Sequence, residues 1–133
     1  MIALFDDIIQ QFGASIGMQG LALRETGALA LDMQQSGKLA FELIGERREE
    51  VAISLTRRVD FQDDRAPSRL LELCHYRAPA PFPVRCGLTR MNDLIFAVRM
   101  ETHEFTLPNL HAALDWLTSL HQQSEAFVSL ARN

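Results

Sequence analysis

The chain has 133 residues, of which 47% are hydrophobic and 23% charged, and its formal net charge is −4. This length suits one domain, residues 1–133, with a proper core. The acidic balance excludes the basic surface typical of nucleic-acid binding, and no apolar run approaches the roughly 20 residues that cross a bilayer. The sequence shows no secretory leader and its two cysteines form no C-x-x-C pair, so we expect a soluble protein of a reducing cytosol.

The first predicted element is an amphipathic helix. Its apolar residues recur at steps of three and four, which places them on one stripe of a helix. They are Phe5, Ile8, Ile9, Phe12 and Ile16. Gly17 is expected to end this helix, because glycine readily adopts the left-handed conformation that caps a C-terminus.

Residues 13–17 of this helix read GASIG and match the pattern G-x-S-x-G of serine hydrolases. The pattern exposes a nucleophile only where a strand leads into the serine and a helix leaves it. Here a helical pattern precedes Ser15, so we expect no catalytic serine.

Three strands with short connections are expected next. Apolar residues alternate with small or polar ones, and Gln34–Gly37 and Gly45–Arg48 separate the segments, as in an antiparallel meander. The apolar positions are Leu29, Leu31 and Met33, then Leu39, Phe41 and Leu43, then Val51, Ile53 and Leu55. From Arg57 to Arg69 the chain is charged, and we expect irregular structure there.

The second half predicts a short helix, two strands and a long helix. Pro67 and Ser68 can begin the short helix, and the three prolines at 79, 81 and 83 favour an extended connection. Alternation predicts strands over 84–88 and 94–100, and Thr106 can cap the last helix. The stripe of that helix is Leu110, Ala113, Leu114, Leu117, Leu120 and Phe127. The order α-β-β-β-α-β-β-α indicates an α+β fold, with an antiparallel sheet of about five strands and helices at both ends.

Residues able to carry chemistry are scattered. The four histidines, at 75, 103, 111 and 121, do not show the spacing of a metal site and are expected on helix surfaces or in loops. Cys86 is expected to be a small hydrophobic residue of a strand. We therefore expect no enzymatic activity, no catalytic residue, no metal and no cofactor.

The outward faces of the strands have unusually small side chains. They carry Ala28, Ala30, Ala40, Ile44, Ala52, Ile95 and Ala97, with charged residues interspersed. Such a face is either ordinary solvated surface or a place where an extended partner chain can lie close to the sheet.

The pattern of residues resembles the class I type III secretion chaperones, the Tir chaperone family. The resemblance rests on a first helix ending in Phe12-Gly13-x-x-Ile16-Gly17, on Leu21-x-Leu23, on the turn at Gly27 and on Leu29-x-Leu31-Asp32. The element order, the length and the long closing helix extend it over nearly the whole chain.

This resemblance implies a homodimer in the bacterial cytoplasm that binds the N-terminal segment of secreted effector proteins. The segment would be held extended and non-globular, and the secretion-system ATPase is a further implied partner. The implied effector contacts are Phe5, Ile8, Leu29, Leu31, Phe41 and Ile44. The implied dimer contacts are Leu70, Leu71, Leu73, Cys74, Val84, Cys86 and Leu88. The alternative is a dimeric regulator or adaptor that binds a folded partner of a secretion system.

Overall fold

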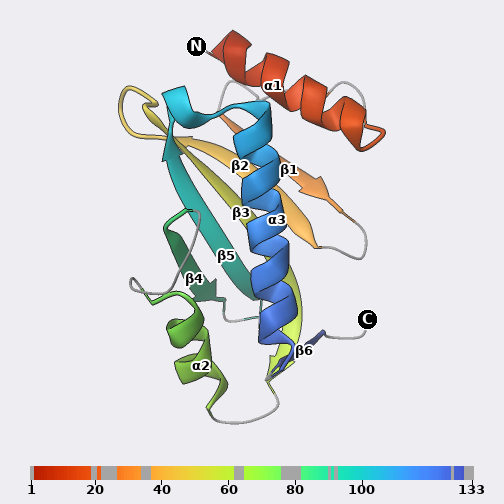
Figure 1. The fold of residues 1–133 in the computed structure, drawn as a ribbon, viewed down its shortest axis with the longest axis vertical. Helices are drawn as coiled ribbons and strands as arrows, with labels where there is room; N and C mark the ends of the chain where they lie inside the picture. The colour runs from red at the N-terminus through yellow and green to blue at the C-terminus, as the bar shows by residue number, and fades with distance from the viewer. Residues whose placement is uncertain are drawn as a thin grey trace.

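A computed structural model describes residues 2–18, 21, 27–33, 37–61, 65–75, 82–89, 91, 93–126 and 128–130. Its elements are α1 (Ile2–Ser15), β1 (Ala28–Asp32), β2 (Lys38–Ile44), β3 (Glu50–Phe61), α2 (Ala66–Leu73), β4 (Val84–Leu88), β5 (Asp93–Glu101), the short 3-10 helix η2 (Thr102–Glu104), α3 (Leu107–Ser124) and β6 (Val128–Leu130). The strands form an antiparallel sheet in the order β1-β2-β3-β5-β4, and β6 pairs with the far end of β3 (Figure 1). The predicted α+β fold is confirmed.

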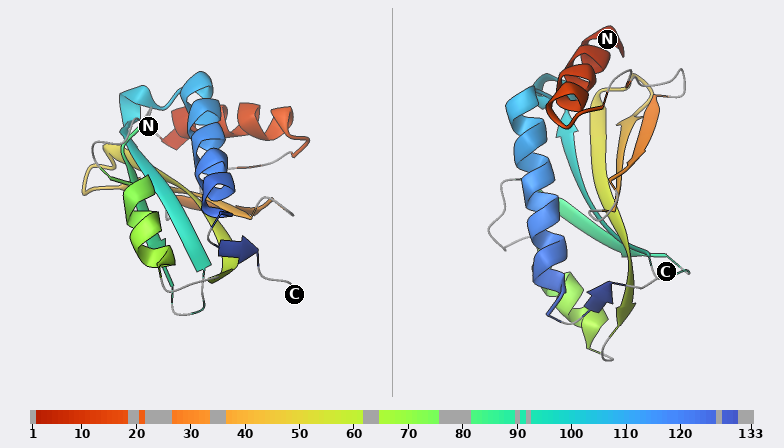
Figure 2. Two further views of the ribbon diagram at one scale, coloured as in Figure 1. Left: turned by 60° about the horizontal axis from the view of Figure 1, so that its bottom comes forward. Right: turned by 90° about the vertical axis from the view of Figure 1, so that its right-hand side faces the viewer.

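The helices are arranged on one side of the sheet. Figure 2 shows α3 running along one face and α1 crossing the end of that same face, while the opposite face carries no helix of the described chain. The helix α2 lies at the lower end, beside β4 (Figure 1). None of the described helices is long and apolar enough to cross a membrane.

The covered face of the sheet forms the core. Strand register aligns Leu31, Leu39, Leu55 and Phe96 in one row across four neighbouring strands, and each of them is at most 5% exposed. The next row of register-paired residues runs parallel to it, from Leu29 on β1 to Val98 on β5. The alternation in the sequence therefore correctly predicts which residues share a face.

The end of α1 depends on two glycines. Gly17 has φ +81°, a conformation that other residues rarely adopt, and it follows the helix as predicted. Gly13 lets the following chain approach the helix closely, because a Cβ at this position would lie 2.8 Å from both Leu21 Cδ1 and the Met18 carbonyl oxygen. The chain can thus fold back directly onto the helix.

Thr106 caps α3 as predicted. Its backbone is extended, and its hydroxyl oxygen accepts a hydrogen bond of 3.3 Å from the Asn109 amide. The cap satisfies one of the amides that a helix start leaves unpaired.

Two expectations about the ends of elements are wrong. β3 continues to Phe61, where irregular structure was expected from Arg57 onward. Arg57 belongs to the covered face and breaks the apolar alternation, yet its side chain is only 9% exposed and pairs with Glu125. α3 ends at Ser124, and the predicted stripe residue Phe127 lies outside the described residues. The pairing of β6 with β3 was not predicted, because three residues are too few for a visible pattern.

Candidate protein-binding surfaces

Exposed apolar side chains occur on α2, at the end of β4 and in the turn that follows β4. Four large hydrophobic side chains are exposed among the described residues, and three of them are here: Leu71 at 67%, Leu88 at 44% and Met91 at 68%. β4 is the last strand of the sheet on this side, so its outer edge has no partner strand in the described chain. We call Leu71, Leu88 and Met91 the β4-edge surface.

The dimer contacts implied by the resemblance divide into three groups. Leu70 is only 5% exposed and belongs to the subunit's own core. Leu71 and Leu88 are exposed, whereas Leu73, Cys74, Val84 and Cys86 are half-buried and pack against the core. Met91 was not predicted, because a lone methionine in a turn has no periodic signal.

Three of the implied effector contacts are core residues. Phe5, Leu31 and Phe41 are 2%, 5% and 1% exposed. The ring of Phe5 lies 4.9 Å from that of Phe105, and the ring of Phe41 lies 6.2 Å from that of Phe12. These side chains therefore stabilise the subunit and present no surface to a partner in this structure.

The remaining implied effector contacts are more accessible. Ile8 on α1 and Leu29 on the edge strand β1 are half-buried and pack against the core. β1 is the terminal strand of the sheet and pairs with β2 alone among the described strands. Ile44 is half-buried at the end of β2. Ile16, which was assigned to the helix stripe, is 37% exposed just after α1.

The uncovered face of the sheet has the small side chains expected from the sequence. Register places Ala30, Ala40, Ser54 and Ala97 in one row across β1, β2, β3 and β5. All four are half-buried or exposed, because no helix of the described chain covers them. Arg99 pairs with Glu50 on the same face. This face thus combines a row of small side chains with an ion pair that contributes both charge signs.

Ser15 is held by its own helix. It is the last residue of α1, and its hydroxyl donates a hydrogen bond of 2.6 Å to the Phe12 carbonyl oxygen. This is a common way for a serine to satisfy its hydroxyl near a helix end. The strand-to-helix turn that a serine nucleophile requires is not the geometry found at Ser15.

His121 contradicts the expectation of a surface histidine. It is 1% exposed, its Nε2 lies 2.7 Å from the Leu55 carbonyl oxygen, and its ring packs edge-on against Phe96 at 4.8 Å. The carbonyl can only accept, so the neutral ring carries its proton on Nε2. Burial lowers the pKa of His121 to about 4, with a smaller contribution from the charge of Arg57. The position four residues after Leu117 was the signal that could have predicted this burial.

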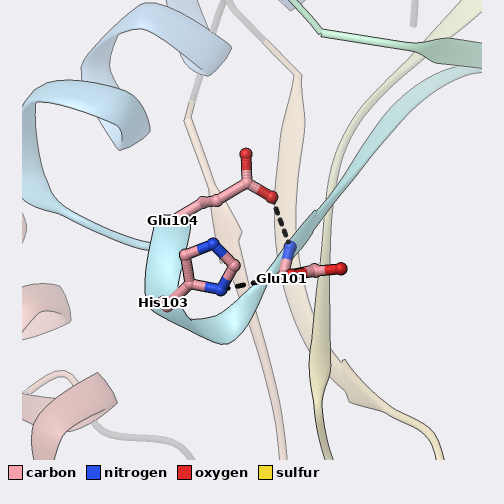
Figure 3. Close-up of side chains that lie close together, drawn as sticks. All are labelled: Glu101, His103 and Glu104. Atoms are coloured by element: carbon pink, nitrogen blue, oxygen red, sulfur yellow. Dashed lines mark hydrogen bonds and ion pairs between the residues drawn. The ribbon is translucent and has the colours of Figure 1, made fainter.

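One group of potential metal ligands is close together at the surface. Glu101, His103 and Glu104 offer ligand atoms within 4.8 Å of one another. The Glu101 amide donates to Glu104 Oε1 at 3.0 Å, and His103 Nδ1 lies 3.2 Å from Glu101 Oε2 (Figure 3). These contacts include the capping box of the 3-10 helix η2, which gives the two glutamates a structural role.

Several solved structures have a similar fold. A chain of the ExsC–ExsE complex matches with a TM-score of 0.74 at 16% identity, over 95% of this chain and 92% of that chain. A chain of the HopA1–SchA chaperone–effector complex matches with a TM-score of 0.68 at 14% identity, over 92% of this chain and 91% of that chain. A chain of the Yersinia pestis type III secretion chaperone SycH, in complex with a YscM2 fragment, matches with a TM-score of 0.65 at 14% identity. The match covers 92% of this chain and 98% of that chain.

These structural likenesses show a shared fold. A search of curated protein sequences gives no significant match. The model of the family described as "Type III secretory system chaperone SycN", in contrast, matches residues 4–125, nearly the whole chain. The chain therefore belongs to the SycN family of type III secretory system chaperones.

Proposed function

We propose that this protein is a cytosolic homodimer that binds the N-terminal segment of a type III secreted effector and keeps it extended until secretion. It would do so without catalysing a reaction. The observation that carries this proposal is the family match over residues 4–125. The apolar side chains at both edges of the sheet give it a physical basis.

The dimer is proposed to form through the β4-edge surface. Leu71 on α2, Leu88 at the end of β4 and Met91 in the following turn are exposed, and contact of these side chains with water is unfavourable in a lone subunit. Burying a large apolar side chain stabilises by about 1.5–3 kcal/mol, so these residues can supply a substantial part of an association energy. The free edge of β4 adds unpaired backbone groups to the same surface.

The effector segment is proposed to bind at the opposite edge of the sheet, along β1. An extended peptide can pair with the backbone of an edge strand, and its alternate side chains can contact the apolar residues beside it. Ile8 on α1 and Leu29 on β1 are half-buried, and Ile44 lies at the end of the neighbouring strand. Ordering a flexible segment costs about 2–5 kcal/mol or more, which burial of about 1,000–3,000 Å² can outweigh.

A dimer improves this binding because one cargo chain can contact two subunits. The second contact is then intramolecular and acts at a high effective concentration. A monomer would hold the same segment much more weakly.

The dimer is tested with the double substitution Leu71→Glu and Leu88→Glu. Two charges in an apolar interface should yield a folded monomer in sedimentation velocity experiments. Ala112→Glu is the matched control, because Ala112 is exposed on α3, away from this edge, and the variant should remain dimeric. A double variant that sediments as a dimer would show that the subunits associate elsewhere.

The cargo site is tested with the N-terminal segment of a type III secreted effector from the same organism. Titration calorimetry should give one segment for two subunits, and circular dichroism of the complex should show no new globular structure in the segment. Ile8→Gln with Leu29→Gln should weaken binding at least about tenfold, equal to 1.4 kcal/mol.

Leu114→Gln is the control for that pair, because Leu114 is also half-buried against the core but lies on α3. It should lower the melting temperature similarly to each of the two substitutions and leave the affinity unchanged. If this protein does not bind the unfolded segment and binds only a folded protein, it is instead a regulator or adaptor.

A further inference from the structure

The two cysteines meet between α2 and β4, although they are far from any C-x-x-C spacing. Cys74 directly follows α2, and Cys86 lies in the middle of β4 with its side chain on the covered face, opposite Phe96. Both are half-buried and both are reduced. The fold, and not the sequence spacing, brings them together.

Both cysteines donate a hydrogen bond to the same backbone carbonyl, that of Leu70. The Cys74 amide donates a hydrogen bond of 3.3 Å to the Leu70 oxygen, and the Cys86 thiol donates to the same oxygen with Sγ at 3.9 Å. Each thiol also contributes to the pKa shift of the other. The shared carbonyl therefore places the Cys86 sulfur beside the last turn of α2, next to Cys74.

We propose that Cys74 and Cys86 form an oxidisable dithiol that peroxide converts into a disulfide within one subunit. A bond of about 2 Å between the sulfurs joins the end of α2 to β4. Disulfides in cytosolic proteins are usually transient, as expected of a site that a reductant reverses. The inference concerns thiol chemistry and stands independently of the chaperone function.

The two thiols have different roles in this reaction. The hydrogen bond from Cys74 lowers the pKa of Cys86 to about 7, so a large share of Cys86 is thiolate near neutral pH. The pKa of Cys74 is raised by the hydrogen bond to Cys86 and by burial. The thiolate is the reactive form of cysteine, so Cys86 is the nucleophile and Cys74 the resolving thiol.

The reaction balances with hydrogen peroxide as the oxidant. The Cys86 sulfur attacks one peroxide oxygen, the O–O bond breaks, and the departing hydroxide takes a proton to become water. Cys86 is then a sulfenic acid. The Cys74 sulfur attacks the Cys86 sulfur, the S–O bond breaks, and the hydroxide leaves as a second water with the Cys74 proton. Two thiols lose two electrons, and peroxide gains them.

The test treats the full-length native protein with hydrogen peroxide and measures intact mass and maleimide-reactive thiols after unfolding. We expect the wild-type subunit to lose two hydrogens in mass and both reactive thiols, and to recover them with dithiothreitol. Two thiols that survive the treatment, or a disulfide that joins two subunits on a non-reducing gel, would overturn the proposal.

Two matched serine variants separate the roles. In Cys74→Ser the sulfenic acid on Cys86 cannot be resolved, so dimedone should trap it. In Cys86→Ser the remaining thiol should react at least about tenfold more slowly and give little adduct. Equal trapping in both variants contradicts the assignment. Circular dichroism checks that each variant is folded, and the wild-type result does not depend on either variant.

Discussion

Acidification should destabilise this protein through His121. The pKa of His121 is lowered to about 4 in the folded state by burial, whereas an unfolded histidine titrates near 6.5. Because the folded pKa is the lower one, the unfolded chain takes up a proton first as the pH falls. Stability is therefore full above about pH 6.5 and is lost progressively between about 6.5 and 4.

The size of this effect follows from the gap between the two pKa values. At 1.36 kcal/mol for each pH unit, the complete loss is about 3.4 kcal/mol, and about 1.4 kcal/mol of it is gone at pH 5.5. The gap is large because the ring packs against Phe96 and its Nε2–H is already used by the Leu55 carbonyl. A charged ring there would be expensive to desolvate.

Urea unfolding of the wild type and of His121→Gln at pH 7.5 and 5.5 measures how much of the free energy of unfolding each protein loses on acidification. Gln can still donate to the Leu55 carbonyl, but it does not titrate, so the variant should lose about 1.3 kcal/mol less than the wild type between the two pH values. Ala112→Gln is the matched control, because Ala112 is exposed on α3 and neither residue titrates, and it should keep the wild-type pH dependence. Equal pH dependence in the wild type and in His121→Gln would refute the argument.

Two further predictions concern the folded subunit. Phe41→Ala should lower the free energy of unfolding by about 3–5 kcal/mol, because Phe41 is 1% exposed; a small change in thermal or urea unfolding would contradict its place in the core. Gly37→Ala should cost about 2 kcal/mol or more, since Gly37 has φ +108° and its new Cβ would lie 2.4 Å from the Thr56 carbonyl oxygen. Gly87→Ala is its control, because no atom lies within 4 Å of a Cβ there, and a similar loss in both variants would contradict the strain argument.

Most of the fold could be predicted from the sequence because most of its strand residues alternate between apolar and small or polar side chains. Leu39, Phe41 and Leu43 on β2 are all at most 8% exposed, as a covered face requires. The cap at Thr106 and the stop at Gly17 are local signals that do not depend on the rest of the chain.

What could not be predicted depends on contacts between distant residues. Arg57 occupies a core-facing position because Glu125, far along the chain, can pair with it at 3.9 Å. His121 can be buried because a backbone carbonyl of β3 accepts a hydrogen bond from its ring. Neither partner can be inferred from local spacing.

The sequence indicated which helices and strands carry the candidate surfaces, but it indicated less well which of their residues are exposed. Alternation shows which residues share a face of a strand, but not how completely α1 and α3 cover that face. Phe5, Leu31 and Phe41 are therefore core residues, whereas Leu71 and Leu88 are exposed on the elements expected to carry the dimer contacts.

The position of α3 in the chain affects how the protein is made. Ribosomes add residues from the N-terminus, and α3, which covers the length of the core face, follows all five strands of the main sheet. Until Leu107–Ser124 has been synthesised, a nascent sheet lacks its main cover and presents apolar rows such as Leu39, Leu55 and Phe96 to water. During translation, this chain is itself exposed to aggregation and depends on its last helix to end that exposure.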